Sequence, residues 1–129
     1  MIYVDTSVAL AHLLAEDRRP ATAFWAENLV SSRLLEYEIW TTLHARELAS
    51  SRSEAAHSLL ARVSLVELAP PVLTRALDAF PVPVRTLDGL HLASLEFLRG
   101  RGHAVELASY DHRMVAAAEA MGISILDLS

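Results

Sequence analysis

The fold of this chain is decided by one short stretch of sequence, Met1-Ile2-Tyr3-Val4-Asp5-Thr6-Ser7. Its apolar run, residues 2–4, predicts a parallel strand that is buried on both faces. Thr6 and Ser7 are residue types that begin helices, and residues 8–15 favour a helix. Asp5 is therefore expected at the carboxyl end of a strand, the edge at which open α/β sheets bind ligands. The alternative is that Asp5 only caps the helix.

The composition limits the kinds of protein that this chain can be. With 129 residues, 53% hydrophobic content, four glycines and five prolines, it is expected to form one folded domain, residues 1–129. The absence of cysteine excludes disulfides, thiolate zinc sites and a cysteine nucleophile. No apolar run approaches the roughly 18 residues of a membrane helix. No basic leader precedes the first strand, so we expect a cytoplasmic protein.

All 11 basic residues are arginine, and the formal net charge is −5. The absence of lysine excludes Schiff-base chemistry and a P-loop lysine. The negative balance argues against a protein that coats nucleic acid non-specifically. That argument weakens if metal ions neutralise several of the carboxylates.

The rest of the chain alternates between strand and helix patterns. Further strands are predicted at residues 29–32, 63–68, 104–108 and 123–126. Helices are predicted at residues 20–28, 34–50, 54–62, 71–79, 85–99 and 112–121. This alternation indicates right-handed βαβ units and a central parallel sheet that helices cover on both sides.

Four acidic residues fall where a parallel sheet could bring them together. Asp5 and Asp111 follow strands, Asp88 begins a helix, and Glu38 lies in the first part of another. Carboxylates held about 4 Å apart repel by about 4 kcal/mol per pair at an effective dielectric constant near 20, so they must bind protons or cations. Oxygen ligands without cysteine favour Mg²⁺ or Mn²⁺. Such ions keep bound water and can promote phosphodiester hydrolysis.

Two residues near these acids allow more than one interpretation. His91 lies three residues after Asp88 on the same helix face. It could bind a metal directly, but an indirect role beside the carboxylate, or a structural one, is the favoured interpretation. Glu36 lies in the first turn of its helix, where we expect a surface residue that complements the helix dipole.

The spacing of four motifs resembles the PIN-domain ribonucleases, and most closely the VapC-type toxins of type II toxin–antitoxin pairs. The motifs are Val4-Asp5-Thr6-Ser7, Ser31-Ser32-Arg33-Leu34-Leu35-Glu36-Tyr37-Glu38, Leu87-Asp88-Gly89-Leu90-His91-Leu92-Ala93 and Ser109-Tyr110-Asp111-His112-Arg113-Met114. The resemblance covers the whole chain. It implies a three-layer α/β/α fold around a mostly parallel, twisted sheet of four to five strands.

The resemblance also implies Mg²⁺-dependent endonucleolytic cleavage of structured RNA, with Mn²⁺ as a substitute. It assigns Asp5 as the central metal ligand, Glu38 and Asp88 to the same main ion, held directly or through water, and Asp111 to a second, weaker site. Thr6 would orient a metal-bound water. Arg113 would contact the scissile strand, or pair with a neighbouring acid. The spacing from Ser32 and Leu34 favours Glu38 over Glu36 as the matching acid.

Partners follow from the same resemblance. The family implies a cognate VapB-type antitoxin whose C-terminal segment directs an arginine into the acid cluster. It also implies a homodimer, and a higher assembly with the antitoxin.

Two other classes of function remain as alternatives. A phosphatase of another α/β class would also place an acid at the end of the first strand. A haloacid-dehalogenase phosphatase, however, needs a second acid where this chain has Ser7, and it uses a lysine that is absent here. A catalytically inactive PIN-like binding module is the non-enzymatic alternative, and the presence of all four acids argues against it.

Overall fold

The computed structural model describes all 129 residues and contains one five-stranded sheet in which neighbouring strands are parallel. The strands are β1 (Ile2–Val4), β2 (Leu29–Ser32), β3 (Val63–Val66), β4 (Glu106–Ala108) and β5 (Ser124–Ile125). Their order across the sheet is β3-β2-β1-β4-β5. The predicted α/β fold with a parallel sheet is therefore confirmed.

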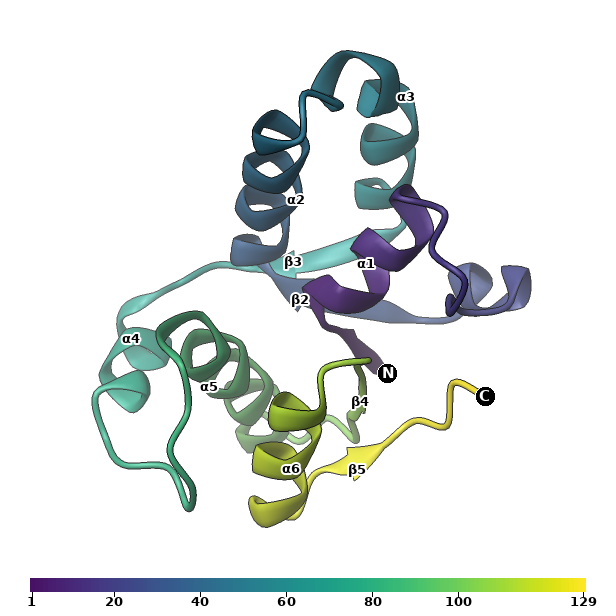
Figure 1. The fold of residues 1–129 in the computed structure, drawn as a ribbon. Helices are drawn as coiled ribbons and strands as arrows, with labels where there is room; N and C mark the ends of the chain where they lie inside the picture. The colour runs from purple at the N-terminus through teal and green to yellow at the C-terminus, as the bar shows by residue number, and fades with distance from the viewer.

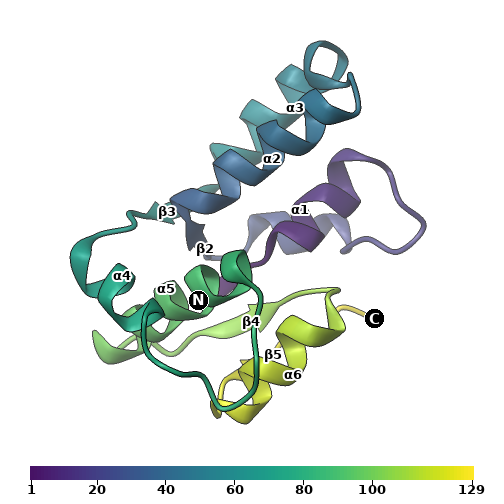
Figure 2. The ribbon, with the colours of Figure 1, turned by 60° about the vertical axis from the view of Figure 1, so that its left-hand side comes forward.

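Helices cover both faces of this sheet (Figure 1, Figure 2). One layer holds α1 (Thr6–Leu13), α2 (Arg33–Ala45) and α3 (Ala49–Leu60), and the other holds α4 (Pro70–Ala76), α5 (Thr86–Gly100) and α6 (His112–Ala120). Strand β1 contributes to both cores: Ile2 and Val4 pack in the α1–α3 layer, and Tyr3 packs in the α5–α6 layer. None of the helices is both long and apolar enough to cross a lipid bilayer.

The strand order creates a switch point in the topology. From β1, the chain adds β2 and β3 on one side of the sheet, and it later adds β4 and β5 on the other. Such a change of direction leaves a crevice at the carboxyl ends of the two strands between which it occurs, here β1 and β4. Asp5 directly follows β1, and Asp111 closely follows β4. The topology therefore brings the two strand-end acids to the same edge.

The predicted helix at residues 20–28 is wrong. Only a short 3-10 helix, η1 (Thr22–Ala26), forms there, and no side chain caps it. Phe24 and Trp25 are both buried, but because they are adjacent they do not form the stripe that stabilises a longer helix. One short turn is enough to bury both rings.

The predicted helix at residues 34–50 ends early and the next one begins early. Helix α2 stops at Ala45, and α3 starts at Ala49, although the sequence predicts its start at Glu54. The other predicted strands and helices are present, with their ends shifted by a few residues.

The early stop of α2 has a defined hydrogen-bonding pattern. Leu48 N–H donates to the Leu43 carbonyl at 2.8 Å, and Glu47 N–H donates to the His44 carbonyl at 3.1 Å. Glu47 has a φ of 56°, in the left-handed region that glycine usually occupies. The sequence lacks the glycine that would mark this helix end, so the pattern of apolar residues predicts a longer helix.

Glu47→Gly should stabilise the protein, because glycine adopts this φ without the strain that a Cβ atom causes. We expect the free energy of unfolding to rise by about 0.5–1 kcal/mol in urea denaturation. The matched control is Glu54→Gly, in the exposed middle of α3, which should lower it by about 1 kcal/mol. Two changes of the same sign would contradict this account of the α2–α3 turn.

Candidate functional site

The four acids predicted from the sequence line one pocket at the carboxyl ends of β1 and β4. This acidic pocket has a volume of about 480 Å³. Its lining residues are Asp5, Thr6, Ser7, Leu10, Glu38, Arg85, Thr86, Leu87, Asp88 and Asp111. Arg85 is the only basic residue among them. The structure thus gathers side chains from α1, α2, α5 and the segment after β4.

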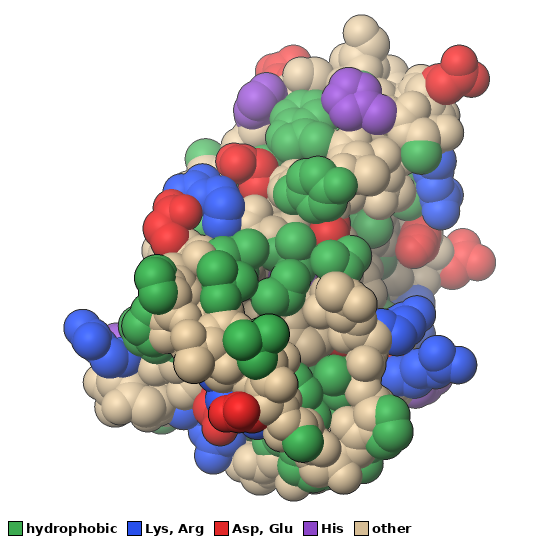
Figure 3. Space-filling model, turned by 90° about the vertical axis from the view of Figure 1, so that its left-hand side faces the viewer, with side chains coloured by type: hydrophobic (Ala, Val, Ile, Leu, Met, Phe, Trp, Pro, Cys, Tyr) green, Lys and Arg blue, Asp and Glu red, His purple; other side chains and the backbone are tan.

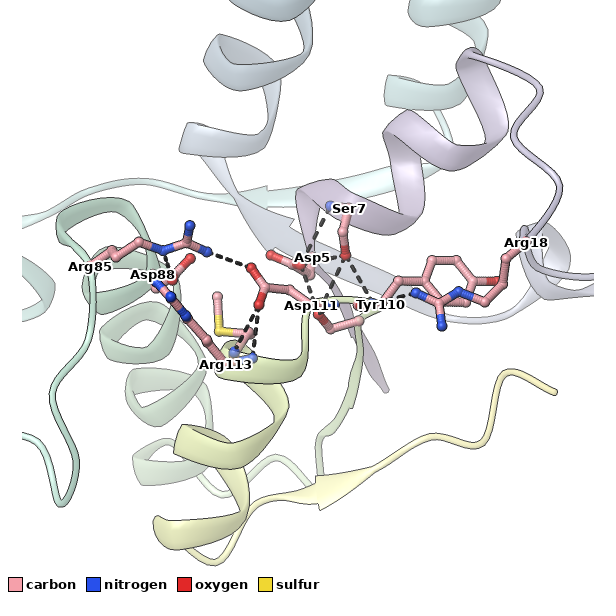
Figure 4. A network of polar contacts seen from close by, with 10 residues as sticks. Asp5, Ser7, Arg18, Arg85, Asp88, Tyr110, Asp111 and Arg113 are labelled. Atoms are coloured by element: carbon pink, nitrogen blue, oxygen red, sulfur yellow. Dashed lines mark hydrogen bonds and ion pairs between the residues drawn. The ribbon is translucent and has the colours of Figure 1, made fainter.

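Asp5 is held by hydroxyl groups from two sides. It is only 5% exposed, and its Oδ2 atom accepts hydrogen bonds from Ser7 Oγ at 2.6 Å and Ser109 Oγ at 2.8 Å (Figure 4). Asp5 is also the N-cap of α1. The two interpretations of Asp5, helix cap and site residue, are therefore compatible. Neither serine is predicted from the sequence as a site residue, although both follow the strand ends where the pocket forms.

Glu38 reaches the pocket from α2 and is bound by two donors. Its Oε1 atom accepts a hydrogen bond from Thr6 Oγ1 at 2.8 Å and lies 2.6 Å from His91 Nε2. His91 does not line the pocket, and its Nδ1 atom lies 2.8 Å from the Tyr3 hydroxyl. Both ring nitrogens are thus engaged within the protein. This geometry favours the indirect role of His91 over direct metal binding.

Arg85 links the other two acids. Its Nε atom lies 3.1 Å from Asp88 Oδ2, and its Nη2 atom lies 2.7 Å from Asp111 Oδ2 (Figure 4). The guanidinium-bearing side chain is 59% exposed, so solvent screens both ion pairs. Arg85 was not among the residues predicted for this site. The one available signal was its i,i+3 spacing from Asp88 at the start of α5.

Asp111 also has a second contact, with its own helix. Its Oδ1 atom accepts hydrogen bonds from the backbone N–H groups of Arg113 and Met114, which caps α6. The Arg113 side chain forms no ion pair with an acid. The salt bridge that was one of the two predicted roles of Arg113 is therefore absent from the structure. Glu36 lies outside the pocket, in the first turn of α2 as predicted, where it also pairs with Arg33.

The pKa of the Asp88 carboxyl reflects the burial and the charges of the pocket. Burial raises the pKa of this carboxyl above its ordinary value, and the nearby carboxylates of Asp111 and Asp5 raise it further. Arg85 acts in the opposite direction and lowers the pKa of Asp88. Because four acids and only one arginine line the pocket, a bound cation would offset part of its negative charge.

The donor set fits a hard divalent cation. No three Asp, Glu or His side chains are close enough together to enclose an ion by themselves. Mg²⁺ commonly binds through one or two carboxylates and keeps several waters, so it does not require such a cage. The carboxylates of Asp5, Glu38 and Asp88 are the oxygens that could hold it, and there is no thiolate to favour zinc.

A second, apolar pocket of about 650 Å³ adjoins the acidic one. It lies between α4 and α5, and Arg85 and Thr86 line both pockets. Leu73 on α4 and Leu77, which caps its C-terminal end, are exposed, Leu77 by 86%. Figure 3 shows hydrophobic side chains gathered on this side of the molecule. The acidic pocket is therefore bordered by an apolar surface.

Comparison with known proteins places the chain among PIN domains. The PIN domain family model matches residues 2–120. The chain is 29% identical to ribonuclease VapC35 of Mycobacterium tuberculosis, over 98% of this chain and 96% of that protein. It is 30% identical to ribonuclease VapC46 of the same species, over 97% of this chain and 95% of that protein. It is 28% identical to ribonuclease VapC47, over 95% of this chain and 93% of that protein. No solved structure matches the chain significantly.

Replacing Arg85 should change the titration of its neighbour. In metal-free protein, Arg85→Gln removes the charge that opposes burial, so the pKa of the Asp88 carboxyl should rise further. Carboxyl-detected NMR titration measures this directly. Arg33→Gln, which removes an arginine paired with Glu67 on the surface, is the control and should leave Asp88 unchanged. An unchanged Asp88 titration in Arg85→Gln would contradict the proposed balance of charges.

Asp88→Asn should change how stability depends on pH. A raised folded-state pKa means that the folded protein holds this proton more tightly than the unfolded chain. The stabilisation is present below the unfolded pKa, near 3.8, and is lost as pH rises through the folded pKa. The measurement is the Tm of the metal-free Asp88→Asn variant minus the Tm of the parent, between about pH 3 and pH 7. This difference should increase with pH, because only the parent loses the stabilisation.

Asp127→Asn provides a control with the opposite sign. Hydrogen bonds from Ser129 lower the pKa of Asp127, so its stabilisation is present above the unfolded pKa and is lost as pH falls. The Tm of the Asp127→Asn variant minus the Tm of the parent should decrease between about pH 3 and pH 7. Parallel pH trends in the two variants would contradict the assigned directions.

Proposed function

Because this chain belongs to the PIN-domain family, we propose that it is a Mg²⁺-dependent endoribonuclease that acts as the toxin of a type II toxin–antitoxin pair. One observation carries the proposal: Asp5, Glu38, Asp88 and Asp111 line the same pocket at the switch point of the sheet. The names of the similar M. tuberculosis proteins, all VapC ribonucleases, agree with it.

Asp5, Glu38 and Asp88 would hold the main divalent ion, in part through its bound waters, and Asp111 a weaker second one. Bound there, Mg²⁺ or Mn²⁺ supplies a more acidic water and offsets negative charge that develops on the phosphate. The two serine hydroxyls on Asp5 Oδ2 keep that carboxylate in one orientation. Their role is to fix the ligand before the substrate arrives, which limits reorganisation during the reaction.

Thr6 and Arg85 have separate tasks in this proposal. The Thr6 hydroxyl donates a hydrogen bond to Glu38, so its oxygen can still accept a hydrogen bond from a water molecule in the pocket. The exposed guanidinium of Arg85 offers donors to a substrate phosphate, with which arginine forms paired hydrogen bonds. Substrate binding would then compete with the ion pairs that Arg85 makes to Asp88 and Asp111.

Neutralisation by a VapB-type antitoxin follows the same electrostatic logic. An arginine side chain from a partner would find an excess of carboxylate in the pocket, because four acids face a single arginine there. The exposed leucines of α4 border this site and suit an apolar contact with the same partner or with a second copy of the chain. We therefore include a cognate antitoxin and a homodimer in the proposal.

The proposal is tested by cleavage of total cellular RNA by the purified chain, free of antitoxin, in Mg²⁺, in Mn²⁺ and in EDTA. Discrete fragments are expected only with a divalent ion. Asp5→Asn and Glu38→Gln should each slow cleavage by at least about 100-fold, because each removes a charge that acts in the transition state. Glu36→Gln is the matched control on the same helix and should cleave at the parental rate.

Each opposing result has a defined meaning. Undiminished cleavage in EDTA would overturn the metal dependence. Equal activity in Glu38→Gln and Glu36→Gln would remove Glu38 from the site. If the folded parental chain cleaves neither tRNA nor ribosomal or messenger RNA in either metal, the chain is a PIN-like binding module and not a nuclease.

A further inference from the structure

A buried histidine contacts Glu38 on the side away from the pocket. His91, on α5, is 2% exposed, and its Nε2 atom lies 2.6 Å from Glu38 Oε1. On the other side of the ring, Nδ1 lies 2.8 Å from the Tyr3 hydroxyl of β1. The Tyr3 and His91 rings meet edge to face, with centroids 5.8 Å apart. The three side chains form a continuous path from the core to the acidic pocket.

The chemistry of the acceptors decides where the protons lie. An ionised carboxylate only accepts hydrogen bonds, so His91 Nε2 must carry a hydrogen toward Glu38. In a neutral ring, Nδ1 is then an acceptor, and the Tyr3 hydroxyl donates to it. Burial raises the pKa of the Tyr3 phenol far above its ordinary value, so this hydroxyl keeps its proton. A doubly protonated ring would present the same Nε2–H group to Glu38.

The two oxygens of Glu38 therefore have different surroundings. Oε1 accepts hydrogen bonds from Thr6 and His91. Oε2 has no hydrogen bond or ion pair within the protein, and the Glu38 side chain is 19% exposed and lines the acidic pocket. Oε2 is consequently the oxygen that is free to contact a cation.

We propose that Tyr3 and His91 are positioning residues, which hold the Glu38 carboxylate through His91 Nε2–H so that Oε2 is available to a divalent cation. This inference rests on the proposed function, because it takes the acidic pocket as the cation site. Neither residue touches substrate or cation. Carboxylate or imidazole groups that orient a metal ligand in this way commonly change metal affinity or activity by about 10- to 100-fold when they are removed.

A purely structural role would not explain the choice of residues. The space between β1 and α5 belongs mainly to an apolar core, in which Leu92 and Leu95 are buried beside His91 on the same helix. The buried hydroxyls of Ser31 and Ser94 lie near the phenol. Apolar side chains could fill this space without the cost of burying an imidazole and a phenol. In this chain the polar pair lies where it meets a carboxylate of the pocket.

Two substitutions of His91 separate its two contacts. The amide nitrogen of His91→Gln can replace Nε2 and still donate to Glu38, whereas that of His91→Asn can replace only Nδ1 and faces Tyr3. The measurement is Mn²⁺ affinity by calorimetry on RNA-free protein, with Tm measured beside it. His91→Asn should bind Mn²⁺ about 10- to 100-fold more weakly than the parent, and His91→Gln should keep most of the affinity.

Tyr3→Phe removes the hydroxyl that contacts His91 Nδ1, and so tests that contact. Imidazole ¹⁵N NMR of the parent should show His91 Nε2 protonated, and in Tyr3→Phe the Nδ1 signal should report the loss of its hydrogen-bond donor. Mn²⁺ affinity should fall, but by less than in His91→Asn. Leu95→Val is the control for packing: it shortens a fully buried side chain one turn away and should lower Tm without changing Mn²⁺ affinity.

The outcomes separate this inference from the proposed function. Weak binding in His91→Asn with recovery in His91→Gln supports the positioning role. Equal Mn²⁺ affinity in all variants overturns the positioning role and leaves the nuclease proposal intact. A loss of Mn²⁺ affinity in Leu95→Val that matches the loss in the His91 and Tyr3 variants has the same meaning. A parental chain that binds no Mn²⁺ overturns both. If His91→Asn does not fold, Tyr3→Phe against Leu95→Val decides the question.

Discussion

Four carboxylates that share one pocket repel one another, and the surrounding polar contacts are arranged to offset that repulsion. Asp5 accepts hydrogen bonds from two serine hydroxyls, and Glu38 accepts them from a threonine and a histidine. Asp88 and Asp111 share one arginine. The offset is incomplete, because four acids share the pocket with a single arginine. Burial, more than the neighbouring carboxylates, keeps the pKa of Asp88 raised. A site that keeps unrelieved negative charge gives up stability and is ready to bind a cation.

The backbone contributes to the same balance. Asp5 caps α1 and Asp111 caps α6, so the N-terminal ends of two helices are directed at the acidic edge of the sheet. The partial positive charge of a helix N-terminus stabilises a nearby carboxylate. Capping and site roles are therefore two consequences of one placement, at the crevice between β1 and β4 where the direction of the topology changes.

The donors differ in how firmly they hold the acids. The hydroxyl and imidazole contacts of Asp5 and Glu38 are largely buried, whereas the arginine that bridges Asp88 and Asp111 is mostly exposed. Buried contacts fix a side chain in one orientation, and exposed ion pairs are screened and readily exchanged for others. The pocket thus has a rigid side, formed by α1, α2 and β1, and a side at Arg85 that can respond to a ligand.

The sequence by itself determined the buried first strand, the alternation of strands and helices, and the four acids that the fold brings together. These features depend on local patterns: apolar runs, capping residues, and acids placed just after strands or early in helices. Only the tertiary structure decided that His91 joins Tyr3 to Glu38 and that Arg85 lies between two acids. Those partners are distant in the chain, and the order of the strands brings them together. The helix end at Glu47 was not predicted for a different reason. Backbone hydrogen bonds at the end of α2, and the packing of Leu48 against the core, accompany a positive φ at a residue that is not glycine, so no sequence signal marks it.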